Sequence, residues 1–403
     1  MSYWKNCKQT QKYSTKKEMS AITRQPYFTE EHEKMRKTIR KFVKEELRPH
    51  ADEWEEAGEF PRDIFKRMGD LGFLGLYYPE EVGGQGGDYF MALVFAEEMH
   101  ACGSGGVSMA TAVQTDMATP PILKFGTKDQ HERFLKPALK GEKMASIGIS
   151  EPNHGSDVAS IETRARREGD EWVINGAKTY ITNGPRADFI TLVTRTSDEP
   201  GYKGISLFLV ESDRPGFSVS KKLDKVGMRA SDTAELIFED VRVPHENLLG
   251  VEGQGFYQIM WELQGERLIS AAGAVAGAEH TYNQVLDYAK NRKQFGRPIV
   301  DNQVIAHLFA EMATEIELCR EMTYATAYRF QQGEVPTKEI SITKLACSQM
   351  AHWVADRALQ IYGGNGYMEE YPAARSWRDS RLARIGAGTD EVMKQIIAKQ
   401  IGL

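Results

Sequence analysis

The chain is poor in cysteine, and it lacks long hydrophobic runs. Its 403 residues include four cysteines, which lie far apart with no Cys-x-x-Cys pair. This spacing excludes a disulfide framework and a zinc site, and it indicates a reducing compartment. The nine histidines include no His-x-x-x-His pair with a carboxylate between them, so we expect no metal. No stretch approaches the roughly 18 apolar residues of a membrane span, so we expect no membrane-spanning helix.

The chain also lacks an excess of positive charge. Its formal net charge is −6, and no basic stripe is interleaved with aromatic residues, which argues against nucleic-acid binding. No Gly-x-Gly-x-x-Gly opens a helix after a strand and no Walker lysine is present, so a dinucleotide would not bind through a Rossmann unit. A hydrophobic content of 41% with 27% charged residues is typical of a globular protein of two or three domains.

The first 26 residues differ from the rest of the chain. They contain six basic residues against one acidic residue, Glu18, and no apolar core of a secretory signal. Three interpretations stay open: a disordered tail, a mitochondrial transit peptide, or residues that precede a true start at Met19. The expected location is the bacterial cytoplasm or the mitochondrial matrix.

The hydrophobic period divides the remainder into three domains, predicted at 27–143, 144–250 and 251–403. The first is helical, and a capping box from Thr127 to Gln130 marks one helix start. The second has period-2 strands, among them a hairpin with a type I′ turn at Asn175-Gly176. The third is helical again. The expected helices are 62–71, 91–99, 128–139, 256–290, 301–332 and 337–362, and the expected strands are 171–174, 178–182, 189–195, 205–211 and 234–238.

The segment 145–157, ASIGISEPNHGSD, runs from an apolar strand into a polar turn. It offers the hydroxyl groups of Ser150 and Ser156, the carboxylates of Glu151 and Asp157, and free backbone N–H groups. From spacing alone a simple capped turn is an equally open reading. The chain also contains TYITNG at 179–184, GGNGY at 363–367 and IGAGTDE at 385–391.

With these segments the sequence resembles the acyl-CoA dehydrogenase family of FAD enzymes, whose first signature reads Thr-Glu-Pro-x-x-Gly-Ser-Asp. The resemblance covers about residues 27–403. It implies an α+β, mostly α fold: an N-terminal helical domain, a middle β-barrel domain and a C-terminal four-helix bundle. Two departures are conservative, Ser150 where Thr is common and Tyr180 where Trp is common. The pair Asn153-His154 has no explanation.

The resemblance also implies which residues contact FAD. Hydroxyl donors suit a flavin ring, because hydride arriving at N5 places negative charge near N1 and O2. Arg292, Gln294 and Phe295 match a segment that reaches FAD across a subunit interface, which implies a homo-oligomer, usually a homotetramer. The complete set of expected cofactor residues is Ile147, Ile149, Ser150, Ser156, Tyr180, Thr182, Arg292, Gln294, Phe295, Gln303, Gln360, Ile361, Gly363, Gly364, Thr389 and Glu391.

The catalytic base is expected to be Glu266. Removing an α-proton from a thioester requires a carboxylate in a dry pocket. The family's usual base position falls on Ala387, which cannot take a proton, whereas Glu266-Arg267-Leu268 matches the isovaleryl-CoA and long-chain branches, which carry the base on a helix. Glu262, one turn earlier, is expected to raise the pKa of Glu266 as a like charge. The expected substrate contacts are Ser156, Leu263, Arg267, Ala387 and Gly388. Without the resemblance, Glu266-Arg267 would be a solvated surface pair.

The expected reaction is FAD-dependent α,β-dehydrogenation of an acyl-CoA to a trans-2-enoyl-CoA, with electrons passed to an electron-transfer flavoprotein. The substrate would come from fatty-acid or branched-chain catabolism. Two alternatives stay open: an oxygen-using flavoenzyme of the same fold, such as an acyl-CoA oxidase or flavin monooxygenase, and a non-catalytic acyl-CoA-binding relative. The stretches 114–120 and 390–393 resemble citronellyl-CoA dehydrogenases, but acyl length and branching stay open.

Overall fold

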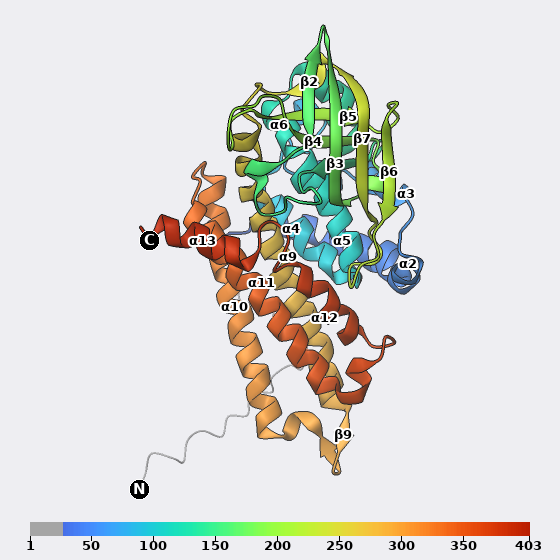
Figure 1. Ribbon diagram of the computed structural model, residues 1–403. Coiled ribbons are helices and arrows are strands. Elements are labelled where there is room, and N and C mark those ends of the chain that lie inside the picture. The colour runs from blue at the N-terminus through green and yellow to red at the C-terminus, as the bar shows by residue number, and fades with distance from the viewer. Residues whose placement is uncertain (1–26) are drawn as a thin grey trace.

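A sheet and a bundle of long helices occupy opposite ends of the molecule (Figure 1). The computed structural model describes residues 27–403. The basic segment 1–26, with its three interpretations, lies outside the described residues. The predicted mostly helical class with a central sheet is confirmed. No helix within residues 27–403 is both long and apolar enough to cross a membrane.

The region before the sheet is built from short helices. The predicted capping box is confirmed, since the Thr127 hydroxyl accepts from the Gln130 backbone N–H at 3.2 Å and the Gln130 side chain accepts from the Thr127 N–H at 3.0 Å. One further element, the π-helical turn η7 (Val113–Ala118), packs against helix α9 (Gly255–Asn291) of the bundle. The α-helices of this region are α1 (Glu30–Phe42), α2 (Ala51–Ala57), α3 (Asp63–Asp70), α4 (Tyr89–Met99), α5 (Gly105–Ala112), α6 (Pro120–Phe125), α7 (Lys128–Gln130) and α8 (Lys136–Leu139).

The middle region forms one sheet with the strand order β6-β7-β3-β2-β4-β5-β8, and β1 pairs in parallel with β4. Within residues 27–403 no pairing joins β6 to β8, so these two strands are the ends of the sheet. Two apolar clusters, one on each side, hold it in place. The strands are β1 (Ala145–Gly148), β2 (Arg164–Glu168), β3 (Glu171–Thr182), β4 (Phe189–Arg195), β5 (Ile205–Glu211), β6 (Phe217–Lys222), β7 (Thr233–Pro244) and β8 (Leu248–Leu249).

The predicted hairpin at Asn175-Gly176 is wrong. β3 continues through both residues as a single strand with a bulge, and the actual reversal lies between β2 and β3, where Gly169 has φ +64°. Gly176 serves a close approach instead of a turn. A Cβ on Gly176 would stand 2.6 Å from the Cα of Thr163, so only glycine lets these two backbones meet.

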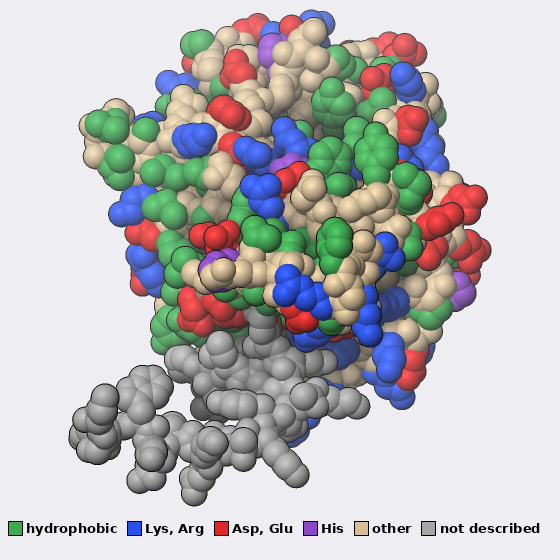
Figure 2. Space-filling view, turned by 90° about the horizontal axis from the view of Figure 1, so that it is seen from below, with side chains coloured by type: hydrophobic (Ala, Val, Ile, Leu, Met, Phe, Trp, Pro, Cys, Tyr) green, Lys and Arg blue, Asp and Glu red, His purple; other side chains and the backbone are tan. Residues whose placement is uncertain are grey.

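The C-terminal bundle confirms the three long helices expected there, each to within two residues. They are α9 (Gly255–Asn291), α10 (Gln303–Gln331) and α11 (Thr337–Tyr362), followed by α12 (Pro372–Leu382) and α13 (Asp390–Gln400). A small ribbon, β9 (Lys293–Gln294) and β10 (Arg297–Pro298), extends beyond the end of α9 (Figure 1). Viewed from this end, the surface mixes basic, acidic and hydrophobic side chains without one sign of charge dominating (Figure 2).

Candidate functional site

The expected base lies inside the molecule, on the first half of α9. Glu266 is 9% exposed and Arg267 is 3% exposed. The interpretation of these residues as a solvated surface pair is therefore wrong. α9 passes α4 and η7 before it enters the bundle, and these neighbours exclude water from this part of the helix. Glu266 is thus a carboxyl group in the dry surroundings that proton abstraction requires.

Three buried carboxyl groups meet here: Glu266, Glu262 one turn earlier on α9, and Asp116 on η7. Burial raises the pKa of Glu266, opposed by Glu262, Arg267 and Lys344. The expectation that Glu262 would raise this pKa further is wrong. Glu262 acts to lower it, because the pKa of Glu262 is itself raised well above its usual range, by burial first and next by the negative charge of Glu266.

Asp116 has a related environment. Burial raises the pKa of Asp116 to about 7, and the nearby Glu266 adds to this effect. A hydrogen bond from the Thr115 hydroxyl, 2.6 Å from Oδ2 of Asp116, acts in the opposite direction. The site therefore holds three acids whose pKa values are all raised by burial, and their protonation is coupled.

The turn that contains the family's usual base position packs directly against α9. The Arg267 Nε donates to the carbonyl oxygen of Ala387 at 3.0 Å, and the Lys344 Nζ, from α11, donates to that of Gly388 at 2.5 Å. Ala387 has φ +55°, an uncommon left-handed conformation for alanine. Two buried cations thus hold this turn beside Glu266, so the predicted substrate residues Arg267, Ala387 and Gly388 lie together.

A cavity of about 240 Å³ opens beside these carboxyl groups. Its wall is mainly apolar and aromatic, with Asp116 and Glu262 as its acidic members. The Tyr89 hydroxyl in the wall donates to the carbonyl oxygen of Gly265 at 3.1 Å. Such a space suits an acyl chain whose reacting end faces α9. The principal apolar residues of the wall are Tyr77, Tyr89, Leu123, Trp261, Ile269 and Phe330.

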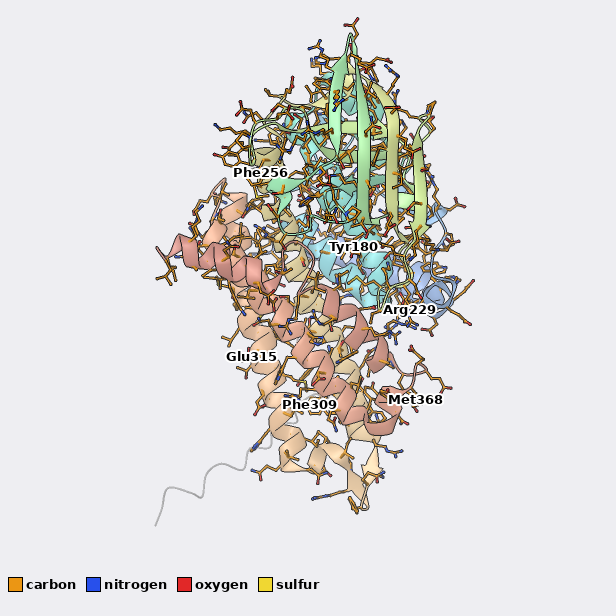
Figure 3. All side chains as sticks on the ribbon, in the orientation of Figure 1. Tyr180, Arg229, Phe256, Phe309, Glu315 and Met368 are labelled. Atoms are coloured by element: carbon orange, nitrogen blue, oxygen red, sulfur yellow. The ribbon has the colours of Figure 1, made fainter. Side chains whose placement is uncertain are left out.

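The expected flavin-ring residues lie where β1 and β3 face the helices, and Tyr180 is labelled there in Figure 3. Tyr180 has φ +62° in a bulge of β3, and its side chain is 71% exposed. A bulge re-aims a side chain, and a tyrosine held in the left-handed region indicates a functional demand. Ser150 is next to β3, since its carbonyl oxygen accepts from the Thr179 N–H at 2.9 Å. Thr182 ends the same strand, and Ile147 and Ile149 pack on the apolar cluster below.

Glu151, expected to offer its carboxylate at this edge, points inward instead. It accepts from the Lys178 Nζ at 2.7 Å and from the Thr163 N–H at 2.9 Å, and it is 4% exposed. Burial opposes ionisation of Glu151, but Lys178 and the backbone donors outweigh it, so the pKa of Glu151 is lowered. Glu151 therefore anchors the turn, whereas Ser156 and Asp157 stay exposed.

A second group of predicted cofactor residues lies at the far end of α9. Between Glu266 and Arg292 the helix rises by about 39 Å, at 1.5 Å per residue over 26 residues. Tyr288 joins the two parts of this group. The Asn365 side chain donates to its hydroxyl at 3.1 Å, and its ring lies tilted against that of Tyr362 with the ring centres 4.3 Å apart. The exposed residues of this end are Arg292, Gln294, Phe295, Gln303, Gln360, Gly363 and Gly364.

Two of the predicted cofactor residues, Ile361 and Thr389, have structural roles in this chain. Ile361 is buried in the bundle core. The Thr389 hydroxyl caps α13 by accepting from the Val392 N–H at 3.2 Å. Glu391 lies exposed in the first turn of that helix. Leu263, an expected substrate contact, packs on the apolar cluster beneath the sheet.

The sequence interpretation missed Asp116 and Lys344 as members of the site. Asp116 is the one charged residue between Gly105 and Leu123, an otherwise apolar and small-residue segment, and this isolation was the available signal. Lys344 lies in a long helix among other polar residues, so its sequence position gave no comparable signal. Within residues 27–403 no cluster of His, Cys, Asp and Glu side chains could hold a metal ion.

Three family models match the chain in succession. They are the acyl-CoA dehydrogenase N-terminal domain at residues 29–142, the middle domain at 146–241 and the C-terminal domain at 253–402. Together they span nearly all of the described residues.

Curated relatives point the same way. A probable acyl-CoA dehydrogenase of Bacillus subtilis is 43% identical over 376 residues, which cover 93% of this chain and 98% of the relative. The mitochondrial long-chain specific acyl-CoA dehydrogenase of Mus musculus is 40% identical over 379 residues, 93% of this chain and 87% of the relative. The mitochondrial isovaleryl-CoA dehydrogenase of Oryza sativa is 38% identical over 376 residues, 93% and 92%. The relatives thus include fatty-acid and branched-chain enzymes from bacteria and mitochondria.

Solved structures share the whole fold. A probable acyl-CoA dehydrogenase from Mycobacterium abscessus superposes with a TM-score of 0.91 at 44% identity, covering 93% of this chain and 100% of that one. A chain from the electron-transferring flavoprotein study of Acidaminococcus fermentans gives 0.90 at 35% identity, with 93% and 98% covered. A glutaryl-CoA dehydrogenase from Mycobacterium smegmatis in complex with FADH2 gives 0.88 at 28%, with 93% and 95% covered. This chain belongs to the acyl-CoA dehydrogenase family.

Proposed function

We propose that this chain oxidises the Cα–Cβ bond of an acyl-CoA thioester to a trans-2-enoyl-CoA, with Glu266 as the base. The observation that carries the proposal is the burial of Glu266 beside the turn that holds Ala387. The family's usual base position is occupied by alanine, and the adjacent helix α9 supplies a carboxyl group with a raised pKa. A raised pKa suits a base that must exchange protons near neutral pH.

FAD is the proposed cofactor, and the residues present fit it. Tyr180 displays an aromatic face to the open space in front of β3, and hydroxyl groups of Ser150 and Thr182 lie on the adjoining strand ends. At the other end of the chain, a Cβ on Gly363 or Gly364 would meet nothing within 4 Å, so the backbone there is open to a ligand. When bound, FAD would supply the acceptor for a hydride from Cβ.

The protein's own residues would perform the rest of the reaction. Glu266 removes the α-proton, and the C–H electron pair becomes the new Cα–Cβ π bond as hydride leaves Cβ. The Ala387 N–H, which has no intrachain hydrogen-bond acceptor among residues 27–403, would donate to the thioester carbonyl and stabilise negative charge there. Arg267 and Lys344 hold that turn in position.

The acyl chain would lie in the cavity between Tyr89 and Trp261. A volume of about 240 Å³ lies just below the range of roughly 300–1,000 Å³ usual for ligand pockets, so it favours a chain of medium length or a compact branched chain over a long one. The wall consists mainly of apolar and aromatic side chains, which favour an apolar acyl chain. Apolar monocarboxylic acyl groups are therefore the proposed class.

The proposal includes a homo-oligomer, a tetramer as is usual in the family, and an electron-transfer flavoprotein as electron acceptor. Phe295 is fully exposed at the tip of the β9–β10 ribbon, and Arg292 precedes it. These residues lie too far along α9 to share one cofactor site with Glu266 in the same subunit. A site built from two subunits would bring both groups to one FAD, and the exposed aromatic ring would be covered there.

One anaerobic experiment tests the proposal against its alternatives. Purified protein is titrated with butyryl-, octanoyl-, palmitoyl- and isovaleryl-CoA while the flavin spectrum is recorded, and air is then admitted. A dehydrogenase bleaches with at least one of these and is reoxidised slowly. Rapid reoxidation by oxygen, with formation of hydrogen peroxide, would identify an oxidase. Protein that binds FAD and acyl-CoA but never bleaches would be a non-catalytic relative.

A further inference from the structure

Glu262 is a buried carboxyl group that pairs with no cation and no backbone N–H of the described residues. It is 2% exposed, and it lines the cavity with Asp116. Within residues 27–403 neither of its carboxyl oxygens receives a hydrogen bond from any donor. An ionised carboxylate in this state would lose its hydration without gaining a compensating hydrogen bond, and this would destabilise the folded protein. A protonated carboxyl group can instead donate a hydrogen bond to a nearby acceptor.

The acceptor that geometry offers is Glu266. The two residues are four positions apart on α9, so their side chains lie on the same face of the helix. Arg267, the nearest cation on the helix, directs its Nε to the carbonyl oxygen of Ala387 instead. The ionisable groups that face Glu262 are Glu266 and Arg267 on α9, Asp116 on η7, Tyr78 before η5 (Glu80–Val82) and, lining the same cavity, Tyr77, Tyr89 and Lys124.

Neither cation among these neighbours donates a hydrogen bond to Glu262. Arg267 donates to the carbonyl oxygen of Ala387, and Lys124 is exposed, with its Nζ 6.0 Å from the centre of the Trp261 ring. Burial raises the pKa of the Tyr77, Tyr78 and Tyr89 hydroxyls, so they stay neutral. Lys344 reaches the Glu266 side of the pair, but burial lowers the pKa of Lys344 to about 8 and its Nζ donates to Gly388. The cluster therefore retains a proton, and Glu262 is the member best shielded from water.

We propose that Glu262 is the positioning residue of the base: it remains protonated at neutral pH and donates a hydrogen bond to the Glu266 carboxylate. The stored proton keeps Glu266 ionised despite its burial, and it fixes one carboxylate oxygen so that the other faces the α-proton. When Glu266 accepts the α-proton, an O–H bond forms on Glu266 and Glu262 keeps its own proton. The pair then holds two protons. This inference rests on the proposed role of Glu266.

The sign of a pH shift distinguishes this role from a charged Glu262. A neutral donor stabilises the Glu266 carboxylate, so removing the donor raises the pKa of Glu266. A negatively charged neighbour would destabilise that carboxylate, so removing the charge would lower the pKa. Glu262→Leu removes both donor and charge, whereas Glu262→Gln keeps a donor of similar size and cannot ionise. Glu262→Gln is therefore the matched control.

The experiment is a pH profile of flavin reduction in the FAD-loaded protein, measured anaerobically with the acyl-CoA of the panel that reduces the wild type fastest. In Glu262→Leu we expect the acidic limb to move upward by about one pH unit, a loss of about tenfold in rate on that limb. The plateau of Glu262→Leu should also be lower than that of the wild type, because no donor then fixes the Glu266 carboxylate. The acidic limb of Glu262→Gln should stay at the wild-type pH, because the glutamine keeps a donor. A downward shift in Glu262→Leu, or superimposable profiles for all three proteins, would overturn the inference.

A second measurement does not depend on activity or on the folding of the leucine variant. At about pH 8, above the pKa of about 7 at Asp116, infrared spectra of the wild type should contain the carbonyl stretch of a protonated carboxylic acid. Glu262→Gln should lose this band, and Asp116→Asn should keep it. Failure of every acyl-CoA to reduce the flavin would overturn the proposed function alone. Reduced flavin without this band would overturn the present inference alone.

Discussion

The Arg267 Nε donates to the carbonyl oxygen of Ala387 at 3.0 Å, and this bond joins two parts of the chain 120 residues apart. Arg267 directly follows Glu266, so the bond places the family's usual base position beside the base that this chain uses. Two different locations for a carboxylate thus converge on one space.

This convergence predicts that the base can be moved. Glu266→Gln combined with Ala387→Glu should recover part of the flavin reduction rate that Glu266→Gln alone loses, because a carboxylate returns to the same space. Recovery should be incomplete, since Ala387 has φ +55° and a longer side chain there adds strain. Anaerobic stopped-flow absorbance measures both rates. A double variant as slow as the single one would argue against a shared space.

A second prediction concerns Tyr180 in its left-handed conformation. Tyr180→Gly removes the exposed ring and relieves a backbone strain of about 1–2 kcal/mol. The free energy of unfolding of the FAD-free protein should therefore stay equal or rise, while FAD binds more weakly. Denaturant unfolding and a fluorescence titration with FAD measure the two effects. Tyr202→Gly, an exposed tyrosine at normal φ, should leave FAD binding unchanged, and equal FAD losses in both variants would refute a flavin contact.

A third prediction concerns the ion pair that anchors the 150–157 turn. Lys178 and Glu151 are 0% and 4% exposed. Lys178→Met leaves Glu151 buried without its cation, which should cost about 3–5 kcal/mol of unfolding free energy. Lys222→Met is the control, because the Lys222–Glu59 pair is half exposed at 3.5 Å and should cost about 0–1 kcal/mol. Equal losses by urea denaturation would show that burial does not decide the strength of these pairs.

The fourth prediction concerns the ribbon beyond α9. Arg292→Ala should release FAD and loosen the oligomer together, because one contact with a neighbouring subunit would serve both. Lys293→Ala, an exposed cation on the same ribbon, provides the control and should retain FAD. Analytical ultracentrifugation with the flavin absorbance reports both properties. A fully active monomeric wild type would rule out the shared site.

Local patterns predicted the elements that local forces decide. The strands 189–195 and 205–211 are apolar runs buried on both sides, and both were placed to the residue. The predicted hairpin at Asn175-Gly176 was wrong because Gly176 is required by a close tertiary contact with Thr163. Turn propensities do not include such a contact. In the same way, a motif pointed to Glu266, whereas Asp116 joins the site only through the packing of η7 on α9.

The most direct test of the account is the rate of flavin reduction in Glu266→Gln. Glutamine keeps the size and a hydrogen-bonding group of the glutamate but cannot accept the α-proton. The variant should hold FAD and bind acyl-CoA as the wild type does, while anaerobic flavin reduction falls by at least the roughly 10²–10⁴ typical of a lost general base. Reduction at the wild-type rate, with FAD and acyl-CoA bound, would contradict the assignment of Glu266 as the base.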